Sequence, residues 1–169
     1  MRQPVVLGIG NRLMGDDGIG LRVVGELERK YASGQSAFQG QNTAPERTGT
    51  LENLKYIAGE TDTGYCLSCL ALGDSCVIID AGSSGKEPCS VDVQTLQEVF
   101  SRDRPLLSFH DFNLLHAMKR ENLIKEGILI TIEISSIEFS LELSPVMKAQ
   151  FYRIVGEVEE IIKHYVDQT

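Results

Sequence analysis

Two aspartates and one histidine stand at positions where a metal ion could be held. Asp17 follows the first apolar run of the chain, Asp80 ends its most β-branched run, and His110 follows a Pro-Leu-Leu segment. Two carboxylates and an imidazole form a mixed oxygen and nitrogen ligand set, which suits Ni²⁺ or Zn²⁺ better than Ca²⁺. Three protein ligands leave coordination positions open, so the set favours a transient or substrate-borne metal over a closed structural site.

Each of these residues also has a plainer interpretation. Asp16 and Asp17 stand before a helical pattern, where one acid serves as an N-cap and a second is favourable in the first turn. We expect Asp16 to cap the helix, at about 1 kcal/mol of stability, and Asp17 to point over the strand ends. Asp80 could be a solvated strand end and His110 a packed or capping histidine, so only the convergence of Asp17, Asp80 and His110 would make a metal site.

The glycine-rich segment around the acid pair invites comparison with a dinucleotide-binding loop. It reads Gly8-Ile-Gly-Asn-Arg-Leu-Met-Gly-Asp-Asp-Gly-Ile-Gly20. The dinucleotide fingerprint needs a third glycine at position 13, where this chain has Leu13. Asp16 and Asp17 would also repel a phosphate group, so a nucleotide-binding enzyme on a Rossmann-like sheet is the weakest of the function classes considered.

No familiar hydrolytic motif accompanies these residues. Ser83, Ser84 and Ser108 lack the Gly-x-Ser-x-Gly elbow, and no His-Glu-x-x-His occurs, so the catalytic residues stay unknown at this point. Cys66 and Cys69 have the spacing of a zinc or redox pair, but no second ligand pair follows them. Their stretch is helix-like, and there we expect cysteine to act as a small buried apolar residue.

The elements that must position these residues alternate between strands and helices. Apolar runs predict strands near residues 4–10, 54–59, 76–80 and 128–134, with a fifth around 137–142 whose direction is open. Helical spacing predicts helices near residues 18–31, 64–72, 94–100, 110–126 and 144–165, the last with a capping Ser144 before Pro145. The series predicts one α/β domain over residues 1–169, a three-layer αβα sandwich with a mostly parallel sheet of about five strands. Function collects at the carboxyl ends of such strands, where the segments carrying the two aspartates and the histidine would meet.

Charge and composition exclude other functions. Lys and Arg number 16 against 24 Asp and Glu, so the net charge is −8 and no basic face for nucleic acid is expected. No apolar run approaches the ~20 residues of a membrane span, and we expect no secretory signal. Four cysteines without such a signal favour a reducing, cytoplasmic setting. Residues 33–50 are rich in Gly, Ser, Thr, Gln and Asn, which predicts a mobile loop that would serve as a lid or client-binding segment.

Four segments together resemble the nickel–iron hydrogenase maturation endopeptidases. They are Gly8-x-Gly-Asn11 with Gly15-Asp-Asp-Gly18, Val77-Ile-Ile-Asp-Ala81, Ser108-x-His110, and Leu143-Ser-Pro145 before a terminal helix. Their order and intervals match the family, and the similarity covers nearly the whole chain.

The resemblance implies a cytoplasmic endopeptidase that removes a short C-terminal extension from the large-subunit precursor of a nickel–iron hydrogenase after nickel insertion. The nickel would be borne by the substrate, another divalent ion such as zinc could substitute, and the family pattern places its recognition on Asp17, Asp80 and His110. Cys89 and Ser135-Ser136 depart from that pattern, as does the length of the 33–50 connection, and these departures leave the client open. A non-cleaving nickel-sensing maturation factor, or a paralogue with another client, would carry the same ligand residues.

Overall fold

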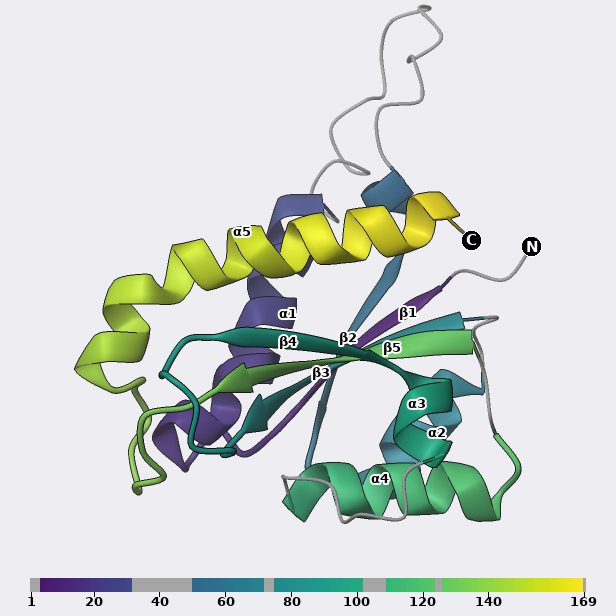
Figure 1. Cartoon of the computed structure of the whole chain (residues 1–169), viewed down its shortest axis with the longest axis horizontal. Coiled ribbons are helices and arrows are strands. Elements are labelled where there is room, and N and C mark those ends of the chain that lie inside the picture. The colour runs from purple at the N-terminus through teal and green to yellow at the C-terminus, as the bar shows by residue number, and fades with distance from the viewer. Residues whose placement is uncertain (1–3, 32–49, 72–74, 102–108, 124–125, 169) are drawn as a thin grey trace, which may run out of the picture.

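Five strands form one sheet that helices cover on both faces (Figure 1). A computed structural model describes residues 4–31, 50–71, 75–101, 109–123 and 126–168. The strands are β1 (Val5–Ile9), β2 (Lys55–Glu60), β3 (Ser75–Gly82), β4 (Val91–Thr95) and β5 (Glu126–Glu133), in the spatial order β2-β1-β3-β5-β4. The predicted three-layer α/β sandwich with a mostly parallel sheet is confirmed. Residues 32–49, nearly all of the predicted mobile loop, lie outside the described residues.

Four strands are parallel, and β4 joins them as an antiparallel edge. The predicted fifth strand at 137–142 is therefore wrong. Ile137, Phe139 and Leu141 alternate with polar residues as a strand would, yet their side chains are exposed and no sheet face covers them. In the described chain this segment makes a single isolated bridge, from Ser140 to Met14, and the fifth strand is the half-exposed β4 instead.

The helices divide between the two faces of the sheet. On one face lie α1 (Ile19–Tyr31) and α5 (Pro145–Gln168), and on the other α2 (Thr63–Leu70), α3 (Leu96–Ser101) and α4 (Phe109–Arg120) (Figure 1). Two short 3₁₀ helices, η1 (Gly15–Gly18) and η3 (Thr50–Asn53), precede α1 and β2. Residues alternate between the two cores along each central strand, so Ile79 and Ala81 face α1 and α5 whereas Ile78 faces α2, α3 and α4. Within the described ranges, no helix has the length and apolarity to span a membrane.

The start of α1 presses directly on the ends of the two central strands. A Cβ atom at Gly20 would lie 2.7 Å from the carbonyl oxygen of Ile9, and closer still to that of Ile79. Both obstacles are main-chain atoms of the sheet, which cannot turn aside as a side chain can. This close approach places η1, one turn before α1, over the carboxyl ends of β1 and β3.

The two glycines of α1 therefore give a matched test of that approach. Gly20→Ala should lower the free energy of unfolding by about 3 kcal/mol, because the added methyl group forces helix and sheet apart. Gly25→Ala, whose Cβ would meet nothing within 4 Å, should raise it by about 0.5–1 kcal/mol, because alanine favours the helix. Urea unfolding of both variants measures the two values. Equal effects would show that α1 is not held by this contact.

Candidate active site

Asp17 lies in η1, at the carboxyl end of β1, and is 9% exposed. Its Oδ2 accepts a hydrogen bond of 2.9 Å from the main-chain N–H of Asn11. Gly10 has a φ of 135°, and a side chain there would collide with the carbonyl oxygen of Asp17, so the turn needs glycine. These contacts hold Asp17 beside the residues that follow the carboxyl end of β1.

The amides of this turn are already engaged within the protein. The N–H of Leu13 donates to Asn11 Oδ1 at 2.9 Å, and that of Gly15 donates to the carbonyl oxygen of Ser140 at 2.9 Å. A phosphate-binding loop keeps such N–H groups free for its ligand. The N–H of Asn11 also donates to the carboxylate of Asp17, so these main-chain donors are used within the turn and not held free for a phosphate.

Asp16 does not cap a helix, and that prediction is wrong. Its side chain is 1% exposed and points away from α1, to the connection between β5 and α5. Oδ1 accepts the N–H of Ser144 at 2.7 Å, and Oδ2 accepts those of Ser135 and Ser136, each at 3.2 Å. One buried carboxylate thus joins the end of β1 to both ends of that connection. The hydroxyl of Ser144, predicted to cap α5, makes no hydrogen bond among the described residues, and its main-chain N–H is used instead.

Asp80 lies inside β3, which runs two residues beyond the predicted end, and its side chain is fully buried. Its Oδ1 accepts the N–H of Ala81 at 2.8 Å. Because neighbouring Ile79 and Ala81 face α1 and α5, Asp80 lies on the opposite face, on the side of α2 and α4. Gly8 of β1 pairs with Ile79, so Asp80 stands next to the end of β1, where the turn to Asp17 begins.

His110 is the second residue of α4, and the described part of the structure includes its main chain but not its side chain. The last residue of α4, Arg120, is joined by a short connection to the first residue of β5, Glu126, so the opposite end of α4 lies toward the carboxyl edge of the sheet (Figure 1). The backbone therefore brings His110 to the edge and the face that hold Asp80. The described side chains, which do not include this imidazole, contain no group of three or more His, Cys, Asp or Glu that could hold a metal ion.

The two cysteines at CxxC spacing are not part of this site. Cys66 and Cys69 are buried in α2, against β1 and β2, and neither forms a disulfide. Burial raises the pKa of the Cys66 thiol to about 11, so at neutral pH it is protonated and a poor metal ligand. The interpretation of both residues as small apolar side chains is confirmed.

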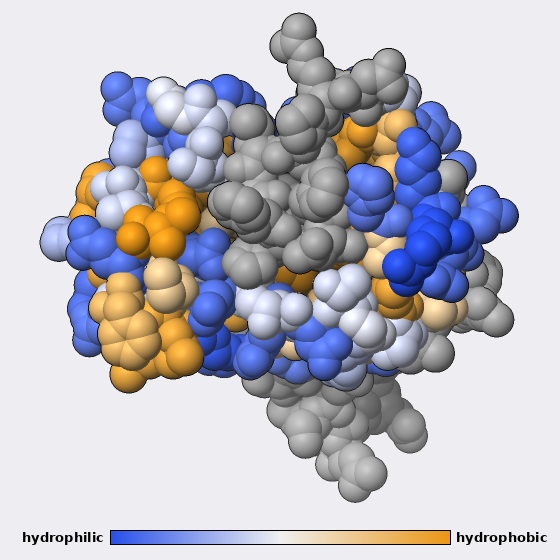
Figure 2. Space-filling view, turned by 90° about the horizontal axis from the view of Figure 1, so that it is seen from below, coloured by the Kyte–Doolittle hydropathy of each residue, from blue (hydrophilic) through white to orange (hydrophobic). Residues whose placement is uncertain are grey.

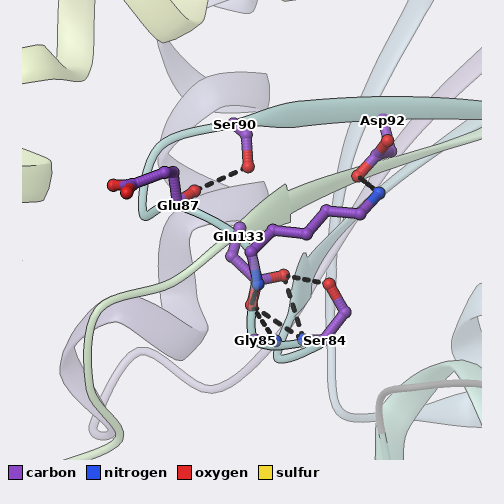
Figure 3. Close-up of polar contacts among 7 residues, drawn as sticks. Ser84, Gly85, Glu87, Ser90, Asp92 and Glu133 are labelled. Atoms are coloured by element: carbon purple, nitrogen blue, oxygen red, sulfur yellow. Dashed lines mark hydrogen bonds and ion pairs between the residues drawn. The ribbon is translucent and has the colours of Figure 1, made fainter.

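Glu133, the last residue of β5, was missed by the sequence analysis. Its side chain is 5% exposed and accepts main-chain hydrogen bonds from Ser84, Gly85 and Lys86 at 2.7–3.1 Å, with a fourth from the hydroxyl of Ser84 at 2.8 Å (Figure 3). Burial alone would raise the pKa of Glu133, but these hydrogen bonds outweigh it and hold the pKa below its usual value. An acid that ends an apolar strand was the signal that singled out Asp80, and the same signal applies to Glu133.

The role of Asp16 leads to a stability prediction. Asp16→Asn should lower the free energy of unfolding by about 2–4 kcal/mol, because an amide group cannot accept all three N–H bonds that the buried carboxylate accepts. Urea unfolding measures this value, and Glu138→Gln, at an exposed position of the same connection, is the matched control. A loss near 1 kcal/mol, as for a simple helix cap, would contradict the anchoring role.

Glu133 leads to a prediction about acid. Since its pKa is lowered in the folded chain, the ionised carboxylate stabilises the fold above its unfolded pKa of about 4.3. That stability should be lost as the pH falls through the lower, folded value. The difference in unfolding free energy between the wild type and Glu133→Gln should therefore be constant above about pH 5.5 and shrink below it. Denaturant titrations between pH 3 and 7 measure it, and a difference that grows in acid would refute the assignment.

Comparison with known proteins agrees with this architecture. The sequence profile HycI, described as hydrogenase maturation protease, matches residues 22–161, a range that includes Asp80 and His110 but not Asp17. The hydrogenase expression/formation protein HupD of Bradyrhizobium diazoefficiens is 32% identical over 84 residues, which are 50% of this chain and 35% of HupD.

Two solved structures have the same fold. The hydrogenase maturating endopeptidase HybD from E. coli aligns over 96% of this chain and 93% of its own, with a TM-score of 0.69 and 21% identity. The [NiFe] hydrogenase maturation protease HybD from Thermococcus kodakarensis aligns over 94% of this chain and 98% of its own, with a TM-score of 0.70 and 23% identity. Because the family profile matches most of the sequence, the chain belongs to the hydrogenase maturation protease family.

Proposed function

We propose that this protein is an endopeptidase that removes the C-terminal extension of a nickel–iron hydrogenase large-subunit precursor after nickel insertion. The observation that carries the proposal is that Asp17, which follows β1, and Asp80 of the neighbouring parallel strand β3 lie toward one edge of the sheet, with the first turn of α4 directed toward the same edge. Family membership supports the peptidase activity, and the donor set of two carboxylates and an imidazole supports nickel as the recognised ion.

In this proposal the nickel arrives as part of the substrate. Asp17, Asp80 and His110 bind open positions of that ion and so hold the end of the precursor against the strand ends. A zinc ion, which accepts the same ligands, would serve as a substitute in experiments. The scissile bond is then attacked by a water that the metal or a carboxylate polarises. Because binding depends on the nickel of the substrate, cleavage takes place only after the metal has been inserted.

The surface beside the site supports a protein as the substrate. Leu13, Ile137, Phe139 and Leu141 are 50–81% exposed, and the Met14–Ser140 bridge holds their two segments together. Figure 2 shows apolar surface at the left end of the molecule, the end at which Figure 1 places the connection from β5 to α5. Exposed apolar side chains gathered in this way are typical of protein–protein contact sites.

A cytoplasmic location is part of the same proposal. Cys66, Cys69, Cys76 and Cys89 are all free and buried. Thiols that persist without pairing suit a reducing compartment. A hydrogenase precursor that still carries its C-terminal extension would be met there.

Three substitutions test the ligand assignment. Asp17→Asn, Asp80→Asn and His110→Ala should each lower processing of nickel-loaded precursor at least 100-fold, because each removes one of the groups that hold the substrate metal. Intact-mass spectrometry of the precursor measures the product. Circular dichroism of each variant should show a folded chain, since the substitutions keep side-chain shape or lie at a helix start.

The matched control is His164→Ala, which removes an exposed histidine near the end of α5 and should process at the wild-type rate. A His110→Ala variant with full activity would remove that residue from the site. If wild type binds nickel-loaded precursor without changing its mass, the protein is instead a nickel-sensing maturation factor that does not cleave. Cleavage of an unrelated nickel protein in place of the hydrogenase precursor would identify a paralogue with another client.

A further inference from the structure

Glu133 and Asp80 occupy the same face of the sheet on neighbouring strands. In the register of β3 and β5, Asp80 pairs with Thr131 and Gly82 pairs with Glu133. Ile130 and Ile132 face α1 and α5, so Glu133 lies on the opposite face, as Asp80 does. The two acids are therefore one pleat apart, and Glu133 stands nearer the carboxyl edge.

The carboxylate of Glu133 is fully occupied by the loop that follows β3. Three successive main-chain N–H groups, those of Ser84, Gly85 and Lys86, converge on it (Figure 3). Gly85 has a φ of 82°, a left-handed conformation that favours glycine and lets the chain curl around the acid. Both oxygens accept from donors of this loop, so Glu133 is arranged as an anchor and not as a metal ligand.

The loop that Glu133 holds is exposed on its outer side. Residues 83–88 are all exposed, whereas the strand before them is buried throughout. The loop continues directly from β3, three residues after Asp80. Lys86 extends from it to Asp92 of β4, at 2.5 Å, which ties the loop to the edge strand as well.

We propose that Glu133 is a positioning residue that holds residues 83–87 as a surface on which the substrate binds, close to Asp80. This inference rests on the proposed function, since the polypeptide that binds against residues 83–87 is the end of the large-subunit precursor. A loop that is already ordered loses less conformational entropy when a polypeptide binds against it. Removing the acid should therefore weaken substrate binding, while the chemistry at the bound metal, held by residues of β3, η1 and α4, continues.

The test uses Glu133→Gln, whose amide group would face the N–H donors of the loop. Affinity for nickel-loaded precursor, measured by biolayer interferometry on the full-length protein, should fall about tenfold, or ~1.4 kcal/mol. The single-turnover cleavage rate at saturating protein should stay within twofold. Ser84→Ala, which removes the hydroxyl bond and keeps the three main-chain bonds, should weaken binding no more than threefold.

One control variant and one independent measurement show whether the effect belongs to Glu133. Glu160→Gln removes the same charge from an exposed position of α5 and should bind like the wild type. Amide hydrogen exchange of Ser84, Gly85 and Lys86 should be at least tenfold faster in Glu133→Gln, at a temperature where both proteins are folded. This measurement shows whether Glu133 orders the loop, independently of substrate binding and cleavage.

Three outcomes would overturn the inference: unchanged precursor affinity in Glu133→Gln, unchanged amide exchange in the loop, or a single-turnover rate that collapses while affinity holds. The last result would place Glu133 among the groups that act on the reacting atoms. A wild type that binds precursor and never cleaves it would refute the proposed peptidase activity. It would not refute the positioning role of Glu133, because the precursor affinities of the variants still test that role.

Discussion

A buried carboxylate must be satisfied by hydrogen-bond donors, and this requirement organises the carboxyl edge of the sheet. Asp16 accepts three main-chain N–H groups from the β5–α5 connection. Glu133 accepts three from the loop after β3. Most side chains of these two loops are exposed and do not pack in the core, so the hydrogen bonds to the two acids hold the loops in place. The edge where function is proposed is shaped by these acids.

The rest of the fold delivers the site residues to that edge. Parallel pairing of β1 with β3 sets Asp80 beside the turn that carries Asp17. The close approach at Gly20 presses the start of α1, and with it η1, onto the strand ends. The direction of α4 brings the main chain of His110 to the same side. Buried packing thus fixes where the candidate ligands lie, and the anchored loops leave an exposed apolar surface beside them for a protein substrate.

Much of the architecture could be predicted from the sequence, because buried parallel strands and amphipathic helices leave plain patterns. The apolar runs at β1, β3 and β5 and the spacing of α1 and α5 are of this kind. The edge strand β4 could not be found, since its residues are half exposed and its neighbour along the chain is a helix. In residues 137–141, apolar and polar residues alternate more clearly than in β4. The apolar side chains of this segment are nevertheless exposed on the surface and do not pack against the sheet.

Some features of the candidate site could be predicted from the sequence and others could not. The positions of Asp17 and Asp80 follow from the ends of predicted strands. The partners of Asp16 do not, because Ser135 and Ser144 are more than a hundred residues away and contribute only main-chain N–H groups. Main-chain donors leave no trace in side-chain type, so a buried acid that binds them resembles a helix cap or a turn former in the sequence.

The most direct measurement compares one large-subunit precursor in its nickel-loaded and metal-free forms, each incubated with the wild-type protein and followed by intact mass. Recognition of the substrate metal predicts that only the nickel-loaded form loses the mass of its C-terminal extension. Equal cleavage of both forms would contradict nickel recognition by Asp17, Asp80 and His110, and cleavage of neither would contradict the proposed peptidase activity.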